Sequence, residues 1–217
     1  MKAVRLLVLL LWSLNLLPLA EAGSLRVRVN DLRGVPVANA VVYAEGNNSG
    51  LTHSKQDAVI DQRNKQFVPY VTAVQVGTSI IFPNSDNIRH HVYSLSPAKR
   101  FELPLYTGIP AKPVLFDKIG FVTLGCNIHD WMVAYVAVVA TPSFDVTGQD
   151  GRGALQDLAA GRYKVAIWHP LLKGKPEQLA QVVELPAGGV RDVAFVLDLK
   201  PDFRARRAPG LSTGGYP

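Results

Sequence analysis

The chain has a single cysteine, Cys126, among 217 residues. One thiol cannot close a disulfide within the chain, so a disulfide-stapled scaffold is excluded. Long stretches with helical periodicity are missing, which argues against a helical bundle. A Gly-rich phosphate loop, a serine nucleophile elbow and paired catalytic carboxylates are also missing. We therefore expect a protein without catalytic activity, in which the lone thiol is either an inert core residue or the ligand of something soft.

The apolar run near the N-terminus, residues 6–19, is too short for a membrane span, which needs roughly 20 residues. Lys2 and Arg5 precede it, and the sequence Ala20-Glu21-Ala22 follows it. This order of charge, apolar run and small residues is typical of a secretory signal peptide. We expect residues 1–22 to be removed, no membrane span to remain, and the mature protein to reach the periplasm of a bacterium.

The positive charge of the chain is modest, with 23 basic and 17 acidic side chains. Removing Lys2, Arg5 and Glu21 with the signal peptide leaves 21 and 16. Part of the surplus lies in the Pro- and Gly-rich end, residues 201–217, which we expect to be a disordered basic tail. The balance gives no reason to expect a nucleic-acid partner.

Short runs of Val, Ile and aromatic residues, separated by Gly, Pro, Asn and Asp, predict an all-β protein. Within residues 54–141 we expect seven strands, at residues 58–61, 72–76, 79–82, 91–95, 114–116, 121–124 and 132–139. Seven strands in about 85 residues are typical of a sandwich or barrel.

Further strands are expected on both sides of this stretch. Before it, residues 25–29 and 40–44 bracket a turn-rich link and predict a pair of neighbouring strands. The polar residues 46–50 are interpreted as a domain boundary. After residue 142 we expect strands at 154–158, 163–168, 181–185 and 192–197, a set too small to close a core alone.

Residues 126–132 read Cys-Asn-Ile-His-Asp-Trp-Met, so that a thiolate, an imidazole and a thioether follow one another between two apolar strands. All three are copper ligands by chemical type. A loop of this spacing brings them together if one more imidazole arrives from another strand, and His90 and His91 are the candidates. Adjacent strand residues point to opposite faces, so only one of the two is expected to bind.

This motif resembles the ligand loop of the cupredoxins, the blue copper proteins, and that of amicyanin in particular. The segment Ile81-Phe82-Pro83-Asn84 is also similar to the family, and the first imidazole, His90, falls six residues after Asn84. The resemblance covers residues 56–141. It aligns His90 with the ligand histidine and His91 with the Asn that usually follows that histidine.

The resemblance implies a Greek-key β-sandwich that holds one copper ion. Its implied ligands are His90, Cys126, His129 and Met132. The residues expected around them are His91 (also the alternative ligand), Asn84, Asn127, and Trp131 as a docking point for a partner. A two-copper centre would need a second cysteine, which this chain lacks. Multicopper oxidases carry His-x-His pairs, which the chain also lacks. A nitrite reductase would need more than the five histidines of this chain.

The flanking segments resemble the carboxypeptidase-regulatory-like β-sandwich. The similarity lies in the Asp-Gly-Arg-Gly sequence of residues 150–153 and in residues 29–42. It implies a small sandwich made of residues 23–53 and 142–200, with the cupredoxin domain, residues 54–141, inserted in or fused to it.

The combination is similar to methylamine-utilisation-like proteins, which implies single-electron transfer with a c-type cytochrome or a quinoprotein dehydrogenase. The alternatives are a copper storage or delivery protein and a β-sandwich binding protein with structural copper.

Overall fold

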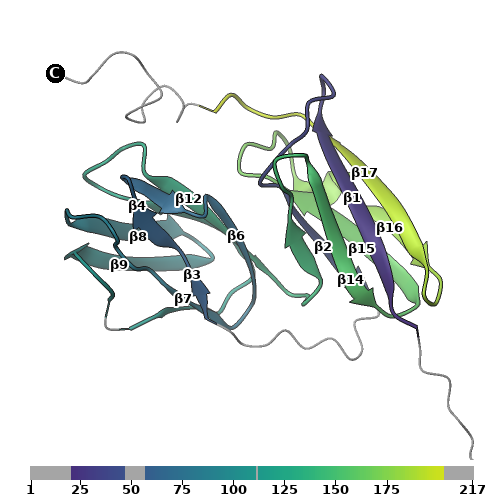
Figure 1. Ribbon diagram of the computed structural model, residues 1–217, viewed down its shortest axis with the longest axis horizontal. Coiled ribbons are helices and arrows are strands. Elements are labelled where there is room, and N and C mark those ends of the chain that lie inside the picture. Colours follow the sequence, from purple (N-terminus) through teal and green to yellow (C-terminus); the bar gives the residue numbers. More distant parts are fainter. Residues whose placement is uncertain (1–20, 47–56, 111, 203–217) are drawn as a thin grey trace, which may run out of the picture.

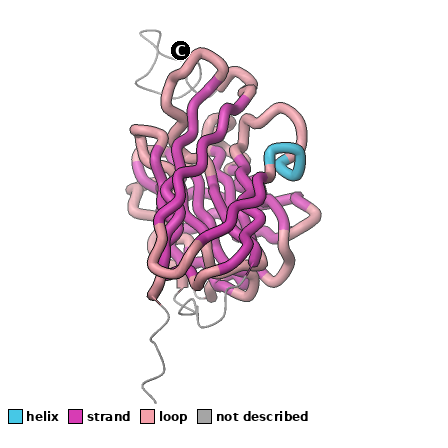
Figure 2. Tube along the Cα trace, turned by 90° about the vertical axis from the view of Figure 1, so that its right-hand side faces the viewer, coloured by secondary structure: helices cyan, strands magenta, loops and turns pink. Residues whose placement is uncertain are grey.

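The computed structural model describes residues 21–46, 57–110 and 112–202. Within them the chain forms strands β1 to β17 and one helical turn, η1 (Pro176–Leu179), which lies at the edge of the strands in Figure 2. The all-β prediction is confirmed. Residues 1–20 of the expected signal peptide, most of the expected boundary at 46–50 and the tail beyond residue 202 lie outside the described residues. In the described part, no helix is long and apolar enough to cross a membrane.

The first sandwich consists of two facing sheets (Figure 1). One has the order β14 (Arg152–Leu158), β1 (Gly23–Asp31), β17 (Val190–Leu197). The other has the order β13 (Phe144–Val146), β2 (Val41–Gly46), β15 (Gly161–Trp168), β16 (Gln181–Leu185). Alternation along β1 buries Leu25, Val27 and Val29 and exposes the arginines between them. The buried side chains of both sheets form one core, which is the physical basis of the sandwich.

The prediction that the first two strands are neighbours is wrong. β1 pairs with β14 and β17, whereas β2 pairs with β13 and β15 in the facing sheet. The Asp31 carboxylate accepts hydrogen bonds from the N–H groups of Arg33 and Val35, which shapes the turn that leaves β1. A turn sequence reports a change of direction, but the choice of sheet depends on pairing with strands more than 100 residues away.

The second sandwich contains the expected strands and three that the sequence did not predict. Its larger sheet has the order β6 (Val71–Gln75), β12 (Val133–Val139), β11 (Gly120–Gly125), β8 (His90–Ser96), β9 (Lys99–Tyr106). The facing sheet is β10 (Val114–Phe116), β7 (Thr78–Ile81), β3 (Ala58–Val59), and the hairpin β4 (Asp61–Arg63) to β5 (Gln66–Val68) forms a separate two-stranded sheet. The unpredicted strands are β4, which shares only Asp61 with the expected strand 58–61, β5 and β9. β9 is an edge strand rich in charged residues, with a proline at 104, so its apolar pattern is weak.

The chain builds β1 and β2, continues into β3 to β12, and returns for β13 to β17 (Figure 1). The two sandwiches meet through a cluster that includes Val41, Val71, Ala137 and Trp168. Phe121 stacks on Trp168 with ring centroids 4.3 Å apart and an interplanar angle of 3°. The first sandwich therefore covers part of the outer face of the β6-β12-β11-β8-β9 sheet.

Candidate metal centre

His90 begins β8 and is completely buried. Its Nε2 lies 2.7 Å from Oδ2 of Asp86. Its Nδ1 is also buried and has no hydrogen-bond partner among the described residues. A buried nitrogen without a partner is costly unless a ligand completes it. His90 is thus held at one nitrogen and open at the other.

Asp86 fixes the orientation of His90. Its carboxylate also accepts hydrogen bonds from the N–H groups of Asn64, at 2.6 Å, and Lys65, at 2.8 Å. Burial alone would raise the pKa of Asp86, but hydrogen bonds from Lys65, His90 and Asn64 outweigh it and lower the pKa below its usual value. The carboxylate is therefore charged and accepts from Nε2–H, which leaves the Nδ1 lone pair of His90 free for a metal.

The loop after β11 carries Cys126 and His129. Sγ of Cys126 lies 3.8 Å from Nδ1 of His129, and the thiol is buried. Backbone hydrogen bonds close the loop. The N–H of Cys126 donates to the carbonyl of Met132, and the N–H of Met132 donates to the carbonyl of His129. The candidate ligand atoms of His90, Cys126 and His129 all lie within 4.8 Å of one another. The fold therefore brings two imidazoles and one thiol to a single point.

His129 is partly exposed, whereas His90 is buried. Burial is the largest factor that lowers the pKa of His129, and the nearby His90 and Lys65 lower it further, while Asp86 acts in the opposite direction. A lowered pKa favours the neutral imidazole, which is the form that binds a metal.

Met132 is buried in the same core cluster as Cys126, directly before β12. Trp131 is half-buried, with its ring centroid 5.2 Å from that of His129. Its Nε1 donates to the carbonyl of Lys65 at 3.1 Å. Trp131 thus covers the loop and ties it to the β4–β5 turn.

His91 lies outside the three-residue cluster. It is buried, its Nε2 lies 2.8 Å from Oε1 of Glu102, and its ring centroid is 5.3 Å from that of Tyr93. Val92, the next residue, belongs to the core cluster that contains Cys126, so alternation along β8 directs His90 and His91 to opposite faces. The structure brings His90 to Cys126 and His129, and leaves His91 beside Glu102.

The two expected asparagines differ in their surroundings. Asn84 is buried; its Nδ2 donates to the carbonyls of Ile88 and Tyr106, and its Oδ1 accepts from the N–H of Asp86. It therefore shapes the segment that leads to His90. Asn127 is exposed in the ligand loop.

Two residues of the site were not identified from the sequence, Asp86 and Lys65. Asn64 and Lys65 have positive φ angles, 52° and 57°, as the two central residues of a tight hairpin turn do. This turn holds Asp86 through two backbone N–H groups and Trp131 through one carbonyl. An Asp four residues before a histidine is the signal in the sequence, but the turn that holds it comes from another pair of strands.

No protein-family model matches the sequence, and no curated protein matches it. Among solved structures, the chain is similar to a purple cupredoxin from Nitrosopumilus maritimus, at 24% identity over 38% of this chain and 100% of that one, with a TM-score of 0.35. A reduced Cu(I) form of an amicyanin mutant at pH 4 is 16% identical over 45% of this chain and 99% of that one, with a TM-score of 0.34.

A Cu-containing nitrite reductase from Thermus scotoductus SA-01 is 20% identical over 44% of this chain, with a TM-score of 0.37, and the match spans only 25% of the reductase. Each of these TM-scores is below 0.5.

Proposed function

We propose that this chain is an exported type 1 copper protein that carries single electrons between redox partners. His90, Cys126, His129 and Met132 are the proposed ligands. Two imidazoles, a thiolate and a thioether form a soft donor set that suits copper, with no carboxylate among them. Copper bound there would exchange one electron between Cu(I) and Cu(II).

The observation that carries the proposal is that His90, whose buried Nδ1 has no hydrogen-bond partner among the described residues, is grouped with Cys126 and His129. Asp86 holds the opposite nitrogen of His90, and backbone hydrogen bonds close the Cys126–Met132 loop. The protein alone makes these hydrogen bonds. We therefore expect the site to hold Cu(I) and Cu(II) with little rearrangement of the ligands. The partly exposed His129 is the proposed exit for the electron.

The proposed partner is a c-type cytochrome or a quinoprotein dehydrogenase, and the proposed location is the periplasm. A storage or delivery protein needs a site that releases its ion easily. Here the strands before Cys126 and after Met132 hold the loop, and His90 closes the site from β8. This arrangement favours electron transfer over delivery.

An absorption titration of the purified protein with Cu(II) tests the proposal. We expect an intense visible thiolate-to-copper band that saturates at one ion per chain and is lost in Cys126→Ser, because a hydroxyl is a poor, hard substitute for sulfur. Cyclic voltammetry with a copper assay after each cycle should show reversible exchange with the metal retained. Persistence of the band in Cys126→Ser, or loss of the ion on reduction, would overturn the electron-carrier proposal.

A further inference from the structure

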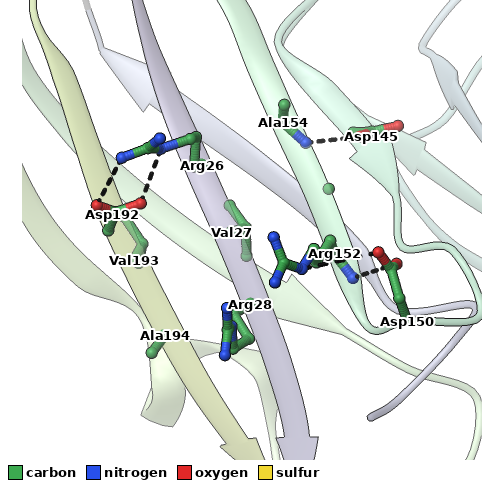
Figure 3. Close-up of a pocket in the computed structure, with 11 residues that line it drawn as sticks. Arg26, Val27, Arg28, Asp145, Asp150, Arg152, Ala154, Asp192, Val193 and Ala194 are labelled. Carbon is green, nitrogen blue, oxygen red and sulfur yellow. Dashed lines mark hydrogen bonds and ion pairs between the residues drawn. The ribbon is translucent and has the colours of Figure 1, made fainter.

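The outer face of the β14-β1-β17 sheet, in the sandwich that does not carry the proposed metal ligands, contains a hollow of about 810 Å³ (Figure 3). Strand residues 154 and 194 are alanines, which leave space between the longer side chains. The charged residues that line the hollow are Arg26, Arg28, Arg152, Asp145, Asp150 and Asp192. Three of these side chains are positive and three are negative. The pairs that they form with one another decide which charged groups remain available to a ligand.

Two of the three carboxylates are already satisfied inside the protein. Asp192 pairs with Arg26 through two hydrogen bonds of 2.9 Å. Asp145 accepts hydrogen bonds from the backbone N–H groups of Val146 and Ala154. Figure 3 shows the Arg26–Asp192 pair and the contact between Asp145 and Ala154.

Arg28 and Arg152 are not satisfied in this way. They are direct cross-strand partners in the antiparallel β1–β14 ladder, and on its other side Arg28 faces Ala194 of β17. Like charges directly opposite each other destabilise a sheet. The guanidinium group of Arg28 makes no ion pair or side-chain hydrogen bond with any residue in the described ranges. Arg152 has only Asp150, at 3.7 Å and with both side chains about two-thirds exposed, a pair that contributes little in water.

We propose that Arg28 and Arg152 form the binding site for an oxyanion, the carboxylate or phosphate of a small organic molecule. A guanidinium offers a fork of donors that matches either group, and an anion between two such forks replaces their repulsion with charge-assisted hydrogen bonds. The volume of the hollow lies within the range of about 300–1,000 Å³ usual for small-molecule sites. The site is independent of the proposed copper centre, so either can fail without the other.

Calorimetric titration of the whole protein, without added copper, with succinate and with inorganic phosphate tests the site. Ionic strength is held constant with sodium chloride, so that a non-specific effect of charge cancels. We expect saturable binding of at least one anion, and a matching rise in Tm because the anion binds the native state. Arg28→Gln and Arg152→Gln should each weaken binding by about tenfold or more, the equivalent of one lost charged hydrogen bond.

Arg191→Gln is the matched control, because it removes the same charge from an exposed position of β17 that does not line the hollow. It should bind like the wild type, and circular dichroism should show that all three variants are folded. Tighter binding of either anion supports the site and assigns its preferred group. The proposal is overturned if neither anion gives a saturable response, or if Arg191→Gln weakens binding as much as Arg28→Gln does.

Discussion

Oδ2 of Asp86 lies 2.7 Å from Nε2 of His90, and Nδ1 of the same ring is buried without a hydrogen-bond partner among the described residues. The same carboxylate accepts hydrogen bonds from two backbone N–H groups of the β4–β5 turn. A carbonyl of this turn accepts a hydrogen bond from the Trp131 indole N–H. The segment before His90 and the loop of Cys126 are thus joined through one hairpin. The residue after His90, His91, lies beside Glu102 and takes no part in this connection.

Replacing Asp86 with Asn should weaken the metal site. The variant loses the negative charge that makes His90 a better donor, so we expect copper affinity to fall by about 10–100-fold. The reduction potential should rise because Cu(II) loses more stabilisation than Cu(I). Competition with a copper chelator and voltammetry measure both effects. Asp117→Asn, on the exposed surface, is the control and should change neither value.

The two adjacent histidines should respond differently to substitution. His90→Ala removes the cluster nitrogen and is expected to abolish the visible charge-transfer band. His91→Ala removes a side chain that faces Glu102, so the band should persist with a shifted potential. Absorption spectra at equal copper loading compare the two variants. If only His91→Ala abolishes the band, the ligand is His91 and the assignment to His90 fails.

Trp131→Phe should separate the tie to the hairpin from the metal site itself. Phe keeps an aromatic ring at this position, but the hydrogen bond from the indole N–H to the carbonyl of Lys65 is lost. We expect the free energy of unfolding to fall by about 1 kcal/mol, measured by denaturant titration of the apoprotein, while the visible band remains. Trp168→Phe, at the contact between the two sandwiches, serves as a comparison that should leave copper affinity unchanged. A complete loss of copper binding in Trp131→Phe would contradict this role.

Asp61 should make stability depend on acid pH. Burial would raise its pKa, but hydrogen bonds from Ser85, Arg63 and the N–H of Gln62 lower it below the ordinary value of 3.8. A carboxyl group with a lowered pKa in the folded state contributes stability above its unfolded pKa, and this contribution is lost as the pH falls through the folded pKa.

Asp61→Asn should therefore cost about 1–3 kcal/mol near pH 7. The difference from the wild type should stay constant down to about pH 5 and shrink below pH 3.8. Urea unfolding at a series of pH values measures it. A difference that stays unchanged at the lowest pH would show that the charge of Asp61 is not what stabilises the fold.

The strand order predicts how fragments behave. Residues 54–142 contain β3 to β12 with their own core and all four proposed ligands, so this fragment should fold and bind copper. Residues 142–200 lack β1, the centre of the β14-β1-β17 sheet, and β2, which lies between β13 and β15. They should not unfold cooperatively on their own. Thermal unfolding followed by circular dichroism distinguishes the two, and a cooperative transition of residues 142–200 would contradict the inserted arrangement.

The sequence by itself was sufficient for the all-β class, for most strands and for the grouping in residues 126–132, because strand alternation and the short spacing of Cys126, His129 and Met132 are local properties of the chain. It also limited the remaining imidazole ligand to one of two adjacent residues, His90 or His91. Only the tertiary structure decided that His90 joins the cluster, that Asp86 and the Asn64–Lys65 turn hold it, and that β1 and β2 lie in opposite sheets.

The pairing of Arg28 with Arg152 was equally out of reach, since 124 positions separate the two residues and the register between β1 and β14 sets their contact. That register follows from burying one face of each strand in a shared core. A single strand specifies which of its residues are buried, whereas the partner against which it buries them is a property of the whole fold.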